Sequence, residues 1–306
     1  MNDSTVLFQQ ARQSAEPVSF DMPWGVIRGL AWGNANAKPL LALHGWLDNA
    51  HSFIPFAEAF LHSDLVNQYR LIAIDWAGHG HSDHRAKGNY YPFMDYVYDL
   101  WYLCEQYLCQ QHQQVTIVAH SMGAYIANMY AGIEPQRVNH LLAVEAFGLL
   151  ASTPAETTND LRKGFQSRWQ QQDKQRPHYR ELSTAVAART HAGDFSRELA
   201  ALLVERGIEQ LGEHDFRFRA DGQLRLKSPV RLTSEQIADV LSHITCTFDV
   251  VLGKAGHARL HEAIAQWKPY VKQLKLHELD GGHHVHMEQP TAIIGLLSQI
   301  TRAHNG

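Results

Sequence analysis

The feature that most constrains the fold is one serine placed between an apolar run and a helix-period run. Residues 115–119 are rich in β-branched side chains, which favour a buried strand, and a helix pattern covers 122–130. A strand that turns into a helix at Ser121 needs small residues on either side, and Ala119 and Gly123 meet this need. The pattern predicts a strained turn that exposes a nucleophile, although an ordinary turn with a capping serine fits the same letters.

Other apolar runs alternate with helix-period segments along the chain. They cover residues 40–43, 70–75, 141–145, 248–252 and 274–279. Such alternation is typical of a parallel sheet with helices on its faces. Two earlier runs, 18–22 and 26–32, flank Pro23-Trp24-Gly25 and predict an antiparallel hairpin at one edge. We therefore expect a mostly parallel, eight-stranded α/β sheet flanked by helices.

The region between the sixth and seventh predicted strands has a different character. A chain of 306 residues slightly exceeds the size of one hydrophobic core, and strand patterns are missing from 151 to 235. The sequence predicts a core of residues 1–150 and 236–306, with a helical cap inserted at 151–235. Phe165, Trp169 and Phe195 are aromatic residues of this cap that either line a substrate site or form the cap's own core.

Charge and cysteine content restrict the class of protein. Lys and Arg number 27 against 31 Asp and Glu, and this near balance does not favour binding of nucleic acid. The three cysteines form no Cys-x-x-Cys pair, which fits a reducing compartment. Residues 1–17 hold no apolar run long enough for a signal peptide or membrane span. We expect a cytoplasmic monomer or homodimer that does not bind membranes.

A second turn carries a candidate oxyanion hole. His44 and Gly45 follow the run at 40–43, and a backbone N–H at Trp46 is then free to face a cleft. Together with the N–H of Met122 at the helix start, it would stabilise the negative charge of a tetrahedral intermediate. The alternative is that His44 and Gly45 only shape a tight turn. The residues expected to contact substrate are His44, Gly45, His120 and Trp169.

A histidine-rich run offers a competing interpretation. Residues 79–84 spell His-x-His-x-Asp-His, the ligand pattern of metallo-β-lactamase-like hydrolases that hold two metal ions. The same segment also fits a glycine-rich loop after the fourth strand. A zinc site needs further ligands after later strands, whereas the serine turn and the His-Gly turn favour a metal-free hydrolase. Exposed loop histidines are the plainest interpretation of His81 and His84.

The general base is expected after the last strand. The strand at 274–279 leads into a loop with three histidines, 283, 284 and 286, before a closing helix. We select His283, because Gly281 and Gly282 allow the backbone to turn toward Ser121. The other two histidines are more typical of packing or surface positions.

The carboxylate that orients the base is less obvious. No acid follows the seventh strand, and Asp249 lies within it. Glu145 closes the apolar run at 141–145, where a buried carboxylate needs a hydrogen-bonded partner, and His283 is suited to this role. A helix-capping role, or an ion pair with a cap arginine, is the alternative for Glu145.

With these motifs in place, the chain resembles the α/β-hydrolases, and more narrowly the serine hydrolase-like proteins. The similar stretches are Pro23-Trp24-Gly25, 43–49, Gly78-His-Gly80, His120-Ser121-x-Gly123 and His283-x-x-His286-Met287. The resemblance implies Ser121 as nucleophile and His283 as base. Haloalkane dehalogenases also place a glutamate after the sixth strand, which supports Glu145, whereas nearer relatives tend to have aspartate. An elbow serine argues against dehalogenase and epoxide hydrolase chemistry, since both use aspartate there.

The expected function is hydrolysis of small to medium carboxylic esters through an acyl-enzyme on Ser121, without a cofactor. Thioester or C–C bond hydrolysis by the same triad is one alternative. A zinc-dependent hydrolase and a non-catalytic binding protein on this fold are two further alternatives.

Overall fold

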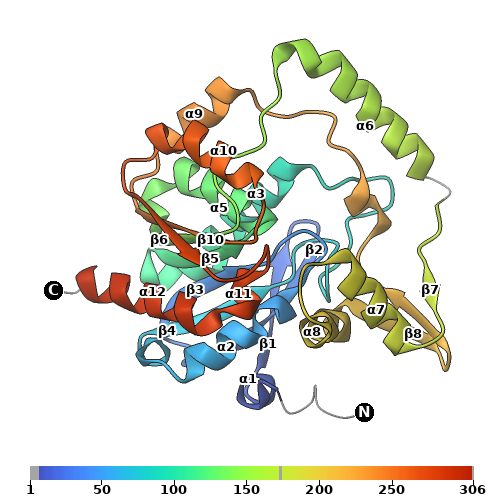
Figure 1. Cartoon of the computed structure of the whole chain (residues 1–306), viewed down its shortest axis with the longest axis horizontal. Coiled ribbons are helices and arrows are strands. Elements are labelled where there is room, and N and C mark those ends of the chain that lie inside the picture. The colour runs from blue at the N-terminus through green and yellow to red at the C-terminus, as the bar shows by residue number, and fades with distance from the viewer. Residues whose placement is uncertain (1–6, 172–173, 305–306) are drawn as a thin grey trace.

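The computed structural model describes residues 7–171 and 174–304, and its centre is one eight-stranded sheet (Figure 1). The strand order is β1-β2-β4-β3-β5-β6-β10-β11. β2 is antiparallel to both β1 and β4, and the other neighbours are parallel, so the predicted mixed edge and parallel centre are confirmed. The strands are β1 (Glu16–Met22), β2 (Gly25–Trp32), β3 (Lys38–Leu43), β4 (Tyr69–Ile74), β5 (Val115–His120), β6 (Val138–Val144), β10 (Thr247–Gly253) and β11 (Leu274–Leu279).

Helices cover both faces of the sheet, which is why its central strands are continuously apolar. All six residues of β5 are buried. In β3, Leu41 and Leu43 belong to the core on one face, while Leu40 and Ala42 belong to the core on the other. The first face is packed by α3 (Phe93–Leu103) and α5 (Met122–Ile133), and the second by α2 (Ile54–Leu61) and α12 (Pro290–His304).

The cap contains a small sheet that the sequence did not predict. Its helices are α6 (Thr157–Gln171), α7 (Leu182–Ala192) and α8 (Arg197–Gly207). A three-stranded antiparallel sheet in the order β7-β9-β8 accompanies them, formed by β7 (His178–Tyr179), β8 (Ile208–Gly212) and β9 (Asp215–Phe218). The sequence analysis expected helices and no strands in this insertion, and the strands escaped it because they are short and none of their residues is fully buried.

The cap has two parts that lie apart in Figure 1. α6 lies at the upper right of the view, and Gly164 is its one buried residue. α7 and α8 pack against each other below it in the same view. The next helix, α9 (Ser234–Ser242), packs against α5 of the core. The cap boundary expected at 235 therefore falls after the first two residues of α9.

A buried ion pair fixes the cap to the core. Arg206 on α8 donates from Nε to both carboxylate oxygens of Asp75, at 3.0 and 2.8 Å. Asp75 follows β4 and also accepts hydrogen bonds from the backbone N–H groups of Ala50 and His81. The side chains of Arg206 and Asp75 are 6% and 0% exposed. Burial raises the pKa of Asp75, but Arg206, together with His44 and the N–H of Ala50, brings the pKa below its ordinary value.

A second buried carboxylate joins three strands of the sheet. Asp249 on β10 lies 3.0 Å from Nε2 of His140 on β6 and 2.6 Å from Nε2 of His277 on β11. Burial raises the pKa of Asp249, yet the hydrogen bonds from the two imidazoles lower it overall. This cluster lies in the middle of the strands. The candidate site described below lies elsewhere, at the carboxyl ends of the strands.

The expectations about the cysteines and about membrane-spanning segments can be compared with the described residues. The cysteines at 104, 109 and 246 are all free and buried. No helix in the described part of the chain is long and apolar enough to cross a membrane. The N-terminal segment 1–17 lies outside the described residues up to position 6, and its remainder forms α1 (Gln9–Gln13) and the start of β1.

Candidate active site

The turn at Ser121 has the strained geometry that its neighbours predict. Ser121 lies between β5 and α5 with φ 48° and ψ −116°, a region that non-glycine residues rarely occupy. A side chain at Gly123 would place its Cβ 2.5 Å from the carbonyl oxygen of Leu43, so only glycine lets α5 approach β3 here. The hydroxyl of Ser121 is thereby held at the carboxyl end of the sheet.

His283 reaches this serine from the loop after β11. Its Nε2 lies 3.0 Å from Oγ of Ser121, and its Nδ1 lies 3.2 Å from Oε2 of Glu145. With Glu145 ionised, Nδ1 carries the proton and donates to it, while Nε2 accepts from the serine hydroxyl. The structure thus brings the three predicted catalytic side chains into one hydrogen-bonded chain.

Glu145 is held as a carboxylate by the turn after β10. It follows β6 with φ 54°, and it accepts hydrogen bonds from the backbone N–H groups of Gly253 at 2.7 Å and His257 at 3.0 Å. A Cβ at Gly256 would lie 2.3 Å from Glu145 Oε1, so this glycine leaves room for the carboxylate. Burial raises the pKa of Glu145, but the hydrogen bonds from His283 and the two N–H groups bring it below its ordinary value. Its partner is therefore His283 and not a cap arginine.

The two backbone groups expected to form the oxyanion hole belong to the start of α5 and to a turn that passes close to Ser121. Met122 begins α5, and the first N–H groups of a helix have no acceptor within the helix. The turn that carries Trp46 passes close to the serine, since a Cβ at Gly45 would lie 3.2 Å from Cβ of Ser121. Leu47 next to it has φ 63° and donates its N–H to Nε2 of His79 at 3.2 Å, which fixes the turn.

The four residues expected to contact substrate lie at different places relative to the cavity at Ser121. His120 lines the cavity at Ser121, and Gly45 permits the close approach of the turn to His120. His44 is fully buried, accepts from the N–H of Trp76 and does not line the cavity, because its ring packs beneath the turn. Trp169 is 75% exposed on α6 and is not among the cavity residues. Of these four residues, His120 is among the residues that line the cavity, and His44, Gly45 and Trp169 are not.

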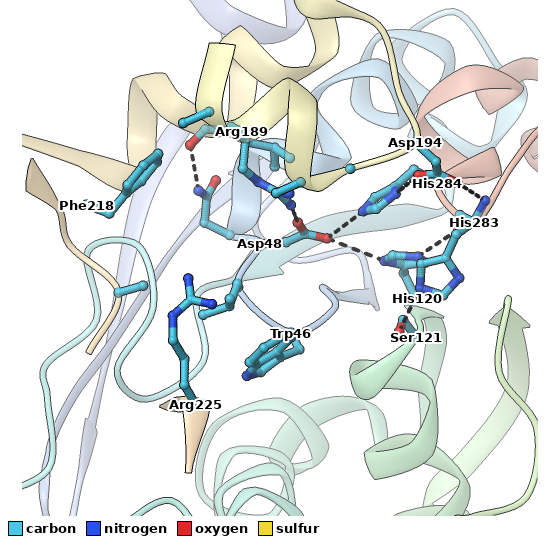
Figure 2. A pocket seen from close by; sticks show the side chains of 18 of the residues that line it. Trp46, Asp48, His120, Ser121, Arg189, Asp194, Phe218, Arg225, His283 and His284 are labelled. Atoms are coloured by element: carbon cyan, nitrogen blue, oxygen red, sulfur yellow. Dashed lines mark hydrogen bonds and ion pairs between the residues drawn. The ribbon is translucent and has the colours of Figure 1, made fainter. Parts of the chain in front are cut away.

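A cavity of about 810 Å³ lies between the core and the cap (Figure 2). Ser121 and His283 form part of its wall. Arg176, Phe218 and Arg225 line it from the cap side. This volume is in the range of cavities that enclose small organic ligands. Of the other two cap aromatics, Phe165 is 57% exposed and Phe195 is buried against His284.

Beside the triad lies a charged cluster that the sequence analysis missed. His284 donates from Nδ1 to Asp194 at 2.5 Å, and its Nε2 lies 3.4 Å from Oδ2 of Asp48 (Figure 2). Arg189 of α7 donates to the other oxygen of Asp48, and Asp194 accepts from the backbone N–H of His283. Burial lowers the pKa of His284, but the two carboxylates raise it to about 9. Two cap residues thus hold the loop that carries the base.

The run at 79–84 does not form a metal site. His79 is buried, with Nδ1 3.0 Å from the carbonyl oxygen of Ala77. His81 and His84 are exposed, and Asp83 pairs with Arg28 at 2.5 Å. Within residues 7–171 and 174–304, the one group that gathers three possible metal ligands is made of other residues, namely Asp48, His120 and His284.

Comparisons with known proteins agree with this architecture. A serine hydrolase-like protein from Danio rerio is 29% identical over 94% of this chain and 88% of its own length. Serine hydrolase-like protein 2 from Homo sapiens is 26% identical over 90% of this chain and 91% of its own length. The crystal structure of a hypothetical protein from Pseudomonas aeruginosa PAO1 has a TM-score of 0.82 at 31% identity and covers 94% of this chain, matching 98% of that structure.

A thioesterase domain from the curacin biosynthetic pathway shares the fold, with a TM-score of 0.80 at 22% identity, and the match covers 93% of this chain and 99% of that domain. The family model for the alpha/beta hydrolase fold matches residues 38–290. The match covers most of the chain and includes Ser121, Glu145 and His283. The chain therefore belongs to the α/β-hydrolase fold family and is similar over nearly its whole length to the serine hydrolase-like proteins.

Proposed function

We propose that this protein is a serine hydrolase that cleaves carboxylic esters of small to medium acyl chains. The observation that carries the proposal is the hydrogen-bonded chain from Ser121 through His283 to Glu145, at 3.0 and 3.2 Å. A serine hydroxyl is a weak nucleophile, and it becomes effective when an adjacent base removes its proton during attack. A third group then keeps that base in the required tautomer.

In the proposed mechanism, His283 takes the proton of Ser121 as its Oγ attacks the ester carbonyl. The imidazolium that forms is stabilised by Glu145 and then protonates the departing alcohol. Water next attacks the acyl-enzyme while His283 again acts as base, which releases the acid and restores the serine. No step uses a metal ion or an organic cofactor.

The backbone N–H groups of Trp46 and Met122 are assigned to the oxyanion. Negative charge develops on the carbonyl oxygen in the tetrahedral intermediate, and two fixed donors there stabilise it without reorganising. The positive φ of Leu47 supports this assignment, because it bends the turn that carries the Trp46 N–H. Each such donor contributes about 3 kcal/mol to transition-state stabilisation in comparable hydrolases.

The size of the cavity favours a substrate with a small or medium acyl group over a polymeric substrate. It encloses about 810 Å³ beneath the cap, and Trp46 and Phe218 offer apolar contact area in its wall. Structural neighbours include the curacin thioesterase domain and an esterase from Mycobacterium tuberculosis. Thioester hydrolysis by the same acyl-enzyme is therefore the second candidate function.

The deciding experiment compares wild type with Ser121→Ala in labelling by a fluorophosphonate and in hydrolysis of p-nitrophenyl esters from acetate to laurate. We expect one adduct on wild type alone, and a loss of about 10⁴–10⁶-fold in kcat in the variant. A matched set of acyl thioesters separates the two substrate classes by kcat/KM. Equal labelling of both proteins, or no labelling of either, would contradict the assignment of Ser121.

A further inference from the structure

Three side chains of metal-ligand type meet beside the triad. Asp48 follows β3, His120 ends β5 and His284 follows β11, so the sheet brings them together at its carboxyl edge. Oδ2 of Asp48 lies 3.5 Å from Nδ1 of His120 and 3.4 Å from Nε2 of His284, and all three atoms lie within 4.8 Å of one another. Their side chains are 1%, 1% and 9% exposed.

Two of these atoms are buried acceptors without a hydrogen bond. Nε2 of His120 lies 2.9 Å from the carbonyl oxygen of His283, so that nitrogen carries the proton. Nδ1 of His120 then presents a lone pair to Oδ2 of Asp48, which is also an acceptor. Neither atom has a hydrogen bond in the described part of the chain, although Oδ2 of Asp48 forms an ion pair with Nε2 of His284 at 3.4 Å. Nδ1 of His120 is thus a buried acceptor without a donor, and a cation beside it and Asp48 would satisfy both atoms.

Each of the three groups is also oriented from its other side. Nδ1 of His284 donates to Asp194 at 2.5 Å, Nε2 of His120 donates to the His283 carbonyl, and Oδ1 of Asp48 accepts from Arg189 at 2.5 Å. Protein zinc sites have this same arrangement, in which the second nitrogen of a ligating imidazole donates to a carboxylate or a carbonyl. Only the three atoms that face one another remain for an ion.

Two of the three separations between the ligand atoms fit a tetrahedral ion. Bonds of about 2.0–2.1 Å to nitrogen and oxygen give a tetrahedron with edges of about 3.3–3.4 Å. The two separations from Asp48, 3.4 and 3.5 Å, match such edges. All three residues line the same cavity as Ser121, which leaves a fourth position for water or an incoming group.

We propose that Asp48, His120 and His284 form a binding site for one divalent transition-metal ion, zinc foremost, and that its occupation inhibits the hydrolase. Two imidazoles favour Zn²⁺, Co²⁺ or Ni²⁺ over Mg²⁺ and Ca²⁺, which prefer oxygen ligands. Binding displaces the proton from Nε2 of His284 to solvent, so one cation replaces another beside Asp48. The site uses none of the His-x-His-x-Asp-His run.

Inhibition rests on the proposed function, whereas binding does not. The ion would lie in the cavity that the ester must enter, next to the loop that carries His283. Its charge would also disfavour the imidazolium that His283 becomes during turnover. Zinc is therefore expected to lower kcat/KM, and a chelator is expected to restore it.

Binding is tested on the Ser121→Ala protein, so that the outcome does not depend on catalysis. Titration with Co²⁺ should give visible absorption of tetrahedral intensity that saturates at one equivalent and disappears when Zn²⁺ is added. X-ray absorption of the zinc-loaded protein should show two imidazole ligands at about 2.0 Å. Mg²⁺ should not compete. Weak octahedral cobalt spectra, or zinc with no imidazole ligand, would overturn the proposal without any further variant.

Variants locate the site. Asp48→Asn and His120→Ala should each weaken Co²⁺ binding more than tenfold, and Asp194→Asn should weaken it by about 10–100-fold through the orientation of His284. His81→Ala with His84→Ala is the matched control on the exposed run, and His257→Ala is the control on the other side of His283; both should bind as the parent does. Loss of binding in either control, or its retention in the first two variants, would refute the site.

Discussion

Replacing Arg206 with methionine is expected to destabilise the fold more than any exchange at an exposed ion pair. The substitution keeps most of the apolar length of the side chain but removes the guanidinium that contacts both oxygens of Asp75. Asp75 is 0% exposed and would remain as a buried charge with two backbone donors. Breaking a buried ion pair in this way costs about 3–5 kcal/mol.

The expected shift in melting temperature follows from the chain length. Unfolding entropies of about 2.1 cal/mol/K per residue give about 0.64 kcal/mol/K for 306 residues. A loss of 3–5 kcal/mol then lowers the Tm by about 5–8 °C. Thermal unfolding followed by circular dichroism at neutral pH measures this shift directly.

Arg217→Met is the matched control. Arg217 pairs with Glu209 at 2.7 Å, but these side chains are 27% and 24% exposed. Such a pair contributes below about 1 kcal/mol, or less than about 2 °C. Adding Asp75→Asn to Arg206→Met removes the unpaired charge and should recover part of the loss. Equal shifts in the two single variants would refute the argument from burial.

Three further predictions concern the triad, the cap and the sheet. Glu145→Gln should lower kcat by about 10³–10⁴-fold with little change in fluorescence-detected folding, and an unchanged kcat would exclude Glu145 as the triad acid. Asp194→Ala should lower both kcat and the fluorophosphonate labelling rate by about 10–100-fold, since it frees the loop that carries His283; a change in KM alone would argue against a positioning role. Asp249→Asn should cost about 2 kcal/mol in urea unfolding at pH 7. Because the folded pKa of Asp249 is lowered, its contribution is present above about pH 4 and is lost as the pH falls further, so wild type and variant should converge in acid.

The sheet and the proximity of Ser121, His283 and Glu145 were predictable because their determinants are local. Each central strand is a short apolar run, and each proposed catalytic residue directly follows a strand or the glycine turn after it. The strain at Ser121 is visible in the sequence through Ala119 and Gly123 alone. Glu145 was found because an acid at the end of a buried strand needs a partner.

The cap residues of the site were not predictable, because no local pattern marks them. Asp194 and Arg189 act through tertiary contacts with His283, His284 and Asp48. The strands of the cap sheet are too short and too polar to show the alternation of apolar and polar residues that is typical of a strand. His44 is the reverse case. Its place in a turn after a strand suggested that it faces a cleft, whereas the fold buries its ring.

The triad is assembled across long stretches of chain, with 162 positions between Ser121 and His283 and 138 between Glu145 and His283. Contacts of such high sequence separation form late in folding, because the entropy of closing large loops must be overcome first. Collapsed intermediates with native helices would therefore lack hydrolase activity. For this chain, the return of activity during refolding is expected to report the pairing of β10 onto β6, which brings β11 and the loop of His283 to Ser121, and it should lag behind the return of helical structure.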